Sequence, residues 1–265
     1  MALLKELIIP HPRYDPDGEL NAFYTAYYKF SRKNQKNMEC ENREDSPDES
    51  RESLIKRVHP FVEFLPETSI VLDLGAGRQI FERGYEDAYG RPKCQIVSVD
   101  IANIRKEQLL AQDYPHIQVS GRNMPFRDEV FEIAISNMAF DFMLPEVLPE
   151  LHRVTKPGAQ VFLNLHHPSL VQYDINRELT QVSRKIKYEE KYGKKSDDKL
   201  RLKRAVFLYH RYLRDSKVLF ETDDQIKCYF NNGGFEVLFV NLQSDLRDKW
   251  WEVDLIKNFH LKDSH

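Results

Sequence analysis

Short apolar runs alternate with helical patterns through the middle of the chain. The apolar runs lie at 69–77, 95–101, 116–121, 132–137 and 159–167. The helical patterns between them lie at 79–89, 103–113 and 144–155. Runs that are apolar at nearly every position are typical of parallel strands covered on both faces, because both sides of each strand are buried. The pattern therefore predicts an α/β protein with a mostly parallel sheet between helices.

The segments on either side of this core follow other patterns. Residues 17–33 have helical spacing, 36–52 form a polar stretch with seven acidic and three basic residues, and 51–65 predict a helix that Pro60 kinks or divides. After His167 the strand–helix alternation stops. It returns as a helix at 222–232 and two strands at 235–243 and 250–257, whose short connection favours an antiparallel pair.

These changes in pattern predict three parts of the chain. Residues 1–52 are expected to form an N-terminal helical lid and an acidic linker. The core is expected at 53–167 and 221–265, and 168–220 are expected to form an inserted cap. A length of 265 residues suits one large α/β domain with such additions.

Composition excludes several classes of protein. The formal net charge is −3, so the chain as a whole is not a polycation. No apolar run approaches the roughly 20 residues that cross a bilayer, and the beginning of the chain does not read as a signal peptide. Three widely spaced cysteines favour reduced thiols and a cytoplasmic location. No set of side chains has metal-ligand spacing, so we expect no metal.

A glycine-rich turn and an acidic residue follow the first two predicted strands. Gly75, Ala76 and Gly77 end the first apolar run, and Asp100 ends the second. Ligands of open parallel sheets bind beyond the carboxyl ends of the strands. Glycine allows close approach of the backbone to a ligand, and a carboxylate there can accept both hydroxyl protons of a ribose. The pair predicts a nucleoside ligand.

Two positions near the glycine turn, Asp73 and Ile80, distinguish between possible nucleoside ligands. A dinucleotide fingerprint has a third glycine where this chain has Ile80, which disfavours a nicotinamide dehydrogenase. Asp73 lies two residues before the first glycine, where its carboxylate could meet an ammonium group or structure the turn. S-adenosylmethionine carries an ammonium and no phosphate, so these residues favour it over NAD.

Four motifs in this region resemble those of class I S-adenosylmethionine-dependent methyltransferases, in particular the small-molecule (type 11-like) branch. They are VLDLGAG, VSVDI, MPFRDEVFEIAISN and ELHRVTKPGAQVFLNL. The resemblance covers 70–165 and returns in GFEVLFV and WWEVDLIK near the end of the chain. It implies a Rossmann-like seven-stranded sheet in the order 3-2-1-4-5-7-6, with strand 7 antiparallel, helices on both faces and a helical insert after strand 5.

The resemblance also implies a role for each matching residue. Gly75, Ala76 and Gly77 would cradle the methionine part of S-adenosyl-L-methionine, with Asp73 near its ammonium; Asp100 would hold the ribose, Ile101 the adenine ring, Ser120 and Gly121 the adenine edge, and Asn137 the methionyl part or the methyl group. S-adenosyl-L-homocysteine would be the product. Two positions depart from the family pattern, because Gln79 replaces a frequent third glycine and Ser120 replaces an acid. Both departures imply weaker binding of the cofactor, or a chain without activity.

The methyl acceptor is expected beyond the same strand ends. His167 and His210 are the candidate general bases, and Asp141 and His166 are candidate substrate contacts. Two simpler interpretations exist: one ring of the pair His166–His167 can form only a local hydrogen bond, and Asp141 can cap the segment that follows it. Tyr24 and Tyr28, with Tyr27, would close a lid over the donor if 17–33 is more than an ordinary core helix.

The predicted insert leaves the acceptor open. Residues 184–217 contain thirteen Lys/Arg and five Asp/Glu, a local excess of +8 that is usually a solvated face. It could also attract an anionic small molecule or an RNA backbone. We favour O- or N-methylation of a small molecule, because no recognisable RNA-binding module accompanies the insert. The alternatives are an RNA or protein methyltransferase and a non-catalytic S-adenosylmethionine-binding protein; the oligomeric state stays open.

Overall fold

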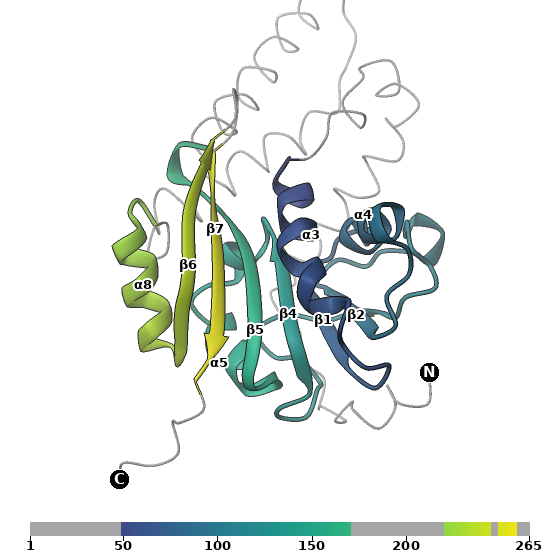
Figure 1. Cartoon of the computed structure of the whole chain (residues 1–265). Helices are drawn as coiled ribbons and strands as arrows, with labels where there is room; N and C mark the ends of the chain where they lie inside the picture. Colours follow the sequence, from purple (N-terminus) through teal and green to yellow (C-terminus); the bar gives the residue numbers. More distant parts are fainter. Residues whose placement is uncertain (1–48, 171–219, 245–248, 259–265) are drawn as a thin grey trace, which may run out of the picture.

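A seven-stranded sheet forms the centre of the molecule. The computed structural model describes residues 49–170, 220–244 and 249–258 (Figure 1). The sheet has the order β3-β2-β1-β4-β5-β7-β6. Its strands are β1 (Ile70–Leu74), β2 (Gln95–Asp100), β3 (His116–Gln118), β4 (Phe131–Asn137), β5 (Thr155–His166), β6 (Phe235–Ser244) and β7 (Lys249–Lys257). Only β7 runs antiparallel to its neighbours, which confirms the predicted order and direction.

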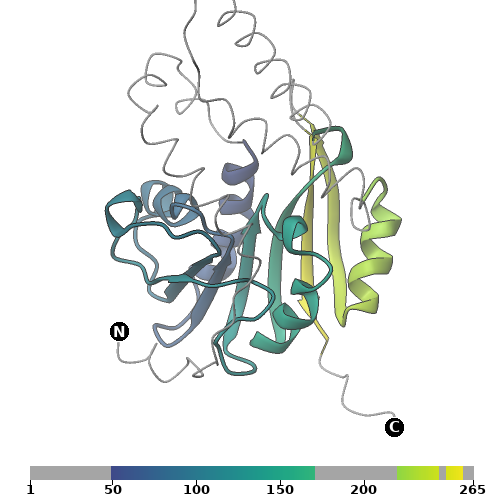
Figure 2. The same cartoon turned by 180° about the vertical axis from the view of Figure 1, so that it is seen from behind.

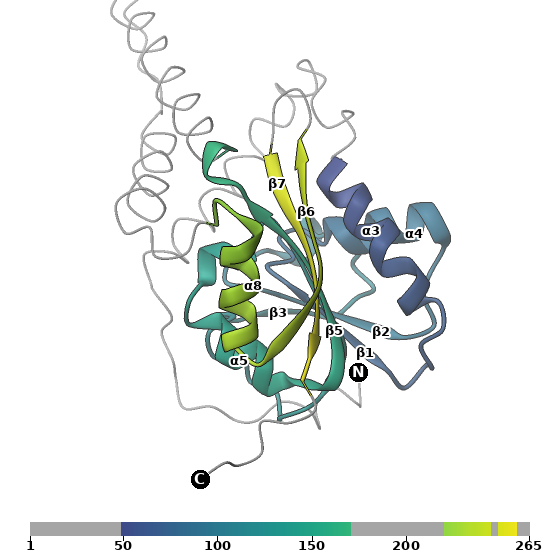
Figure 3. The same cartoon turned by 60° about the vertical axis from the view of Figure 1, so that its left-hand side comes forward.

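Helices cover both faces of this sheet. Figure 3 shows α3 (Glu49–Val62) and α4 (Ile80–Tyr89) on one face, and α5 (Val147–Val154) and α8 (Asp223–Asn232) on the other. Figure 2 shows the second face from behind. Two 3₁₀ turns, η2 (Lys106–Gln108) and η3 (Phe140–Met143), follow β2 and β4. Among the described residues no helix has both the length and the apolar character needed to cross a membrane.

The strands supply the cores on the two faces through alternate residues. Ile70, Leu72 and Leu74 of β1 belong to the cluster under α5 and α8, whereas Val71 belongs to the cluster under α3 and α4. Successive side chains of a strand point to opposite faces, so continuous apolar runs fill both layers. Asp73 shares the α3/α4 side with Val71, and this places a carboxyl group beside the carboxyl end of β1.

The helix predicted at 103–113 is wrong. Within this range the structure has only the short turn η2. Arg78 Nε donates to the carbonyl of Gln108 at 2.9 Å, and Leu110 N donates to the carbonyl of Arg78 at 2.9 Å. Because these groups pair with the loop after β1, they do not form the i to i−4 bonds of a helix. Pro60, in turn, does not divide α3, which continues to Val62.

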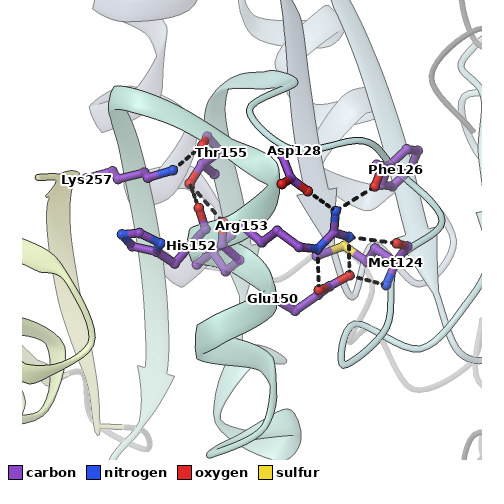
Figure 4. A network of polar contacts seen from close by, with 9 residues as sticks. Met124, Phe126, Asp128, Glu150, His152, Arg153, Thr155 and Lys257 are labelled. Carbon is purple, nitrogen blue, oxygen red and sulfur yellow. Dashed lines mark hydrogen bonds and ion pairs between the residues drawn. The ribbon is translucent and has the colours of Figure 1, made fainter. Parts of the chain in front are cut away.

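Arg153, at the end of α5, holds the loop between β3 and β4 in place (Figure 4). Its guanidinium donates to the carbonyls of Met124 at 3.0 Å and Phe126 at 2.8 Å. It also pairs with Asp128 at 2.7 Å and with Glu150 at 2.6 Å, and these contacts raise the pKa of Arg153. Charge-assisted bonds of this kind are stronger than neutral ones. Two of the sequence motifs, MPFRDEVFE and ELHRV, therefore meet in one ionic network.

Candidate functional site

A cavity of about 220 Å³ lies at the carboxyl ends of β1, β2 and β4. Ligands of open parallel sheets bind in this position. All nine residues predicted to bind the cofactor line it: Asp73, Gly75, Ala76, Gly77, Asp100, Ile101, Ser120, Gly121 and Asn137. They come from four separate stretches of sequence, and the fold brings all of them to one site.

Two glycines of the cavity wall leave no room for a side chain. Gly75 has a φ of +77°, and a Cβ there would lie 2.4 Å from the Cβ of Ala139. A Cβ on Gly121 would lie 2.6 Å from Met143 Sδ. Gly75 N donates to the Val99 carbonyl at 2.9 Å, which fixes the turn beside β2. Glycine is therefore required at Gly75 for the backbone conformation and for the close approach to Ala139, whereas a Cβ at Gly121 would displace the ends of the Met143 and Leu74 side chains.

Backbone amides orient the carboxylate of Asp100. Gly77 N donates to its Oδ2 at 2.8 Å, and Ala102 N donates to its Oδ1 at 2.8 Å. Burial raises the pKa of Asp100, while these two hydrogen bonds and one from Ile101 oppose the rise. Each oxygen keeps a further lone pair for a ligand hydroxyl. The glycine turn and the end of β2 thus build one preorganised acceptor.

Asp73 is a buried carboxyl group with an unsatisfied oxygen. Its exposed fraction is 3%, and Oδ2 has no hydrogen-bond partner. Burial raises the pKa of Asp73 well above its usual range, and the neighbouring carboxyl of Glu82 raises it further. Burial also raises the pKa of Glu82. An unpaired buried acceptor is costly unless a donor reaches it, and a ligand ammonium in the cavity would provide one.

The structure accommodates the two departures from the family pattern in different ways. Gln79 has a φ of 65°, the left-handed conformation that glycine adopts most easily. Its side chain does not line the cavity; Nε2 donates to Ser98 Oγ and to the Tyr114 carbonyl, both at 3.2 Å. Ser120 does line the cavity, and its Oγ accepts from Arg122 N at 3.3 Å. Gln79 therefore preserves the backbone conformation of the turn, while Ser120 places a hydroxyl in the cavity wall where the family has a carboxylate.

Two arginines of the cavity wall were not predicted from the sequence. Arg51 reaches it from the first turn of α3, and Arg122 from the loop after β3. Arg122 Nε lies 3.5 Å from Glu146 Oε2. Arg51 lies within the stretch that the sequence predicted as an acidic linker, and α3 already begins at Glu49. Only the path of α3 across the sheet brings this cation to the cavity.

The fold pairs two of the predicted acceptor-side residues, Asp141 and His166, and gives His167 a different partner. His166, at the end of β5, lies with Nδ1 2.8 Å from Oδ2 of Asp141, which is 4% exposed. His167 Nδ1 instead meets the hydroxyl of Ser169 at 2.8 Å, and burial together with Lys249 lowers the pKa of His167. His210, Tyr24 and Tyr28 lie outside the described residues. The described part of the chain contains no group of three His, Cys, Asp or Glu side chains that could hold a metal.

Comparison with protein families finds a match in the middle of the chain. Residues 72–163 match a family described as a methyltransferase domain. Over 93 residues the chain is 31% identical to malonyl-[acyl-carrier protein] O-methyltransferase of Pectobacterium atrosepticum. That match covers 34% of this chain and 36% of the relative, so it spans about a third of the relative's length. The family match at 72–163 contains most of the four motifs, and it contains every lining residue of the cavity except Arg51.

Two solved structures are similar over nearly the whole chain. One is the 1,6-didemethyltoxoflavin-N1-methyltransferase of Burkholderia thailandensis with 1,6-didemethyltoxoflavin and S-adenosylhomocysteine bound, at a TM-score of 0.56, 12% identity and coverage of 95% and 94% of the two chains. The other is from the complex of the Haloferax volcanii Trm112 methyltransferase activator with a methyltransferase. Its TM-score is 0.57 and its sequence identity 14%, and the match covers 92% of this chain and 99% of that one. At these identities the likeness shows the fold, and with the family match it confirms the resemblance read from the motifs.

Proposed function

We propose that this chain, which carries a methyltransferase domain on the fold of the class I S-adenosylmethionine-dependent methyltransferases, transfers a methyl group from S-adenosylmethionine to a small-molecule acceptor. The observation that carries the proposal is the cavity in which Asp73 and Asp100 flank the turn from Gly75 to Gly77. One carboxyl group suits an ammonium and the other suits a ribose. The donor has both groups and no phosphate.

The residues of the cavity fit the rest of this donor. Asp73 would accept from its ammonium, Asp100 would accept from the ribose hydroxyls, and Arg51 would face its carboxylate. Ile101, Ser120 and Gly121 would contact the adenine. The bound donor supplies a sulfonium methyl group that a nucleophile can displace directly. The chain would contribute alignment of the two reactants and exclusion of water.

The experiment that tests the donor is a calorimetric titration with S-adenosylmethionine, S-adenosylhomocysteine and NAD. We expect both adenosyl ligands to bind and NAD not to bind. Asp100→Ala should weaken adenosyl binding about tenfold or more, because two hydrogen bonds to a charged acceptor are lost. The matched control is Asp113→Ala, an exposed carboxylate that lies 3.6 Å from Arg91. Equal affinities for wild type and Asp100→Ala would contradict the proposed ribose site.

The acceptor is proposed to be a small molecule methylated at oxygen or nitrogen. The curated relative is named for O-methylation of malonyl-[acyl-carrier protein], and the Burkholderia structure for N1-methylation of 1,6-didemethyltoxoflavin. These names support both acceptor atoms. An RNA or protein acceptor is the alternative, supported by the basic stretch at 184–217. Binding of RNA that weakens steeply with salt, without turnover of small acceptors, would favour that alternative.

The pair Asp141–His166 is our candidate for proton removal from such an acceptor. A buried carboxylate at 2.8 Å fixes the orientation of the imidazole, and Met143 of the same η3 turn lines the cavity. General bases contribute about 10²–10⁴-fold to rates. We expect His166→Gln to lower kcat by this order with an acceptor found by screening, and His167→Gln to lower it less. Donor affinity should stay unchanged in both variants, and an unchanged kcat in His166→Gln would contradict the assignment.

A further inference from the structure

Four polar side chains form a row across one face of the sheet. The strand registers place Asn137 of β4 beside Asn164 of β5, Asn164 beside Glu252 of β7, and Glu252 beside Asn241 of β6. Asn164 is fully buried and Glu252 is 2% exposed. Buried polar groups are retained in a sheet at a cost unless they are hydrogen-bonded. The first member of the row, Asn137, lines the cavity.

Helix α3 crosses this row and bonds to it through three residues, Ser50, Ser53 and Arg57. Ser50 and Arg57 are seven residues apart, so they lie two turns apart on the same helix face. Arg57 Nη2 donates to Asn164 Oδ1 at 2.5 Å, and Arg57 Nη1 pairs with Asp254 of β7. The carbonyl of Ser50 accepts from Asn164 Nδ2 at 2.5 Å. Asn164 is thus held by the helix from both sides.

These partners determine which way the Asn164 amide faces. A guanidinium can only donate, so the atom that meets Arg57 must be the amide oxygen. A backbone carbonyl can only accept, so the atom that meets Ser50 must be the amide nitrogen. The same nitrogen lies 2.9 Å from the side chain of Asn137. Its remaining proton therefore needs an acceptor there, and only Oδ1 of Asn137 can be one.

The orientation of Asn137 follows from that of Asn164. Its Oδ1 accepts from Asn164 Nδ2 and also from Ser50 Oγ at 3.3 Å. The amide NH₂ of Asn137 must then face the other way, and none of the described residues accepts a hydrogen bond from it. Because Asn137 lines the cavity, this NH₂ is a donor available to a ligand.

The position of this donor indicates what it binds. Val71 to Asp73 of β1 pair with Ile133 to Ile135 of β4, so Asp73 and Asn137 lie on adjacent strands near the same strand ends. Asp73 offers an acceptor, while Asn137 and Arg51 offer donors. An α-amino acid group presents an ammonium and a carboxylate side by side, and this set is complementary to both.

We infer that Arg57 and Asn164 are positioning residues that hold the Asn137 amide with its NH₂ facing the carboxylate of the methyl donor. The inference rests on the proposed function, since it concerns the amino-acid end of S-adenosylmethionine. The chain of contacts runs from Asp254 through Arg57 and Asn164 to Asn137. Arg57 and the Ser50 carbonyl exclude the flipped orientation of the Asn164 amide. Asn164 in turn keeps Oδ1 of Asn137 on its own side, so that the NH₂ of Asn137, and not its oxygen, faces the cavity.

The test compares two ligands that differ only in the carboxylate. These are S-adenosylhomocysteine and S-adenosyl-3-thiopropylamine, titrated calorimetrically into the full chain. Asn164→Asp keeps the shape of the side chain but cannot donate to Asn137. We expect it to weaken S-adenosylhomocysteine binding roughly tenfold to a hundredfold, the worth of a hydrogen bond to a charged group, and to leave the second ligand unchanged. Asn231→Asp, an exposed residue of α8, is the control for added charge.

A second variant covers the case in which Asn164→Asp does not fold. Asn137→Asp retains the oxygen that accepts from Ser50 and Asn164 but replaces the NH₂ by a second oxygen. It should show the same loss for the carboxylate-bearing ligand alone. Equal losses for both ligands, or unchanged binding of S-adenosylhomocysteine by the folded variants, would overturn the inference. If wild type binds neither ligand, the proposed function itself fails, and the inference with it.

Discussion

The two faces of the sheet use the same strands for different purposes. Under α5 and α8 the strands contribute to one large apolar cluster that includes Leu72, Phe131 and Phe230. Under α3 and α4 the apolar side chains share the face with buried polar ones such as Asp73 and Asn164. Because successive residues alternate between faces, one strand can serve both.

This division between the faces indicates where stability and ligand binding can be changed separately. A substitution in the apolar cluster removes buried area and leaves a cavity, so its effect is on unfolding. A substitution among the polar groups of the other face changes the charges and donors that a ligand meets. We expect the effect on stability to decrease from the apolar face to the polar face and then to the outer surface.

The largest effect is expected from Phe230→Ala on the apolar face. Phe230 is fully buried, with its ring 6.1 Å from Phe140 and 6.0 Å from Phe220. Loss of a buried aromatic ring costs about 3–5 kcal/mol in free energy of unfolding. Urea unfolding measures this loss. The control is Leu238→Ala, because Leu238 is 53% exposed and should change stability little. If the two variants lose similar free energy of unfolding, Phe230 does not contribute to stability as a core residue.

A smaller and pH-dependent effect is expected from Asp73→Asn on the polar face. The pKa values of Asp73 and Glu82 are raised in the folded chain, so the folded state binds more protons than the unfolded state above pH about 4. Wild-type stability should therefore fall as pH rises from there through the raised pKa values. One proton accounts for at most about 1.4 kcal/mol per pH unit. The amide of the variant cannot titrate, so the slope should decrease.

The same variant separates stability from binding. At pH above neutrality Asp73→Asn should be as stable as wild type or more so, because the amide can donate to the neighbouring carboxylate of Glu82 without carrying a second buried charge. Its affinity for S-adenosylhomocysteine should fall, since the ammonium loses an anionic acceptor. Urea unfolding across pH and calorimetry measure the two effects. Asp113→Asn serves as the exposed control. If the dependence of stability on pH is the same in Asp73→Asn as in wild type, the raised pKa of the pair Asp73–Glu82 is refuted.

The smallest effect is expected from Asp87→Ala on the surface of α4. Asp87 pairs with Arg83 at 2.9 Å in an i to i+4 arrangement, and both side chains are more than half exposed. Exposed pairs of this kind contribute about 0.3–0.5 kcal/mol and are screened by salt. Thermal unfolding at low and high salt should show a difference near this size only at low salt. A larger loss would mean that α4 depends on more than its buried face.

Local sequence predicted the strands of the sheet and nine residues of the cavity wall. Apolar runs of about 4–8 residues bounded by glycine and acidic residues are short-range signals. The order and direction of the strands were implied by the resemblance to the class I methyltransferases, and the structure confirms both. The nine residues predicted around the cofactor all line one cavity, because the carboxyl ends of parallel strands meet at one edge. The cofactor prediction, S-adenosylmethionine, agrees with that family.

Local sequence misled where backbone partners come from elsewhere. The range 103–113 has helical spacing, yet its groups pair with Arg78 in a loop 30 residues earlier. Gln79 stands where the family has glycine, and the tertiary packing of its amide against Ser98 and Tyr114 holds the left-handed backbone. In both cases the decisive partner is distant in sequence.

The tertiary structure alone placed Arg51 at the cavity and Asn164 beside Asn137. Arg51 and Asn164 belong to different parts of the chain, and 113 positions separate them. Arg51 lines the cavity because α3 packs across β4 and β5, and Asn164 contacts the cavity residue Asn137 because strand register places the two side by side. Register and helix crossing arise from the packing of the whole domain, whereas hydrophobic period and turn glycines are properties of neighbouring residues. For that reason the sequence could indicate the ligand, and only the folded chain could show how its donors are oriented.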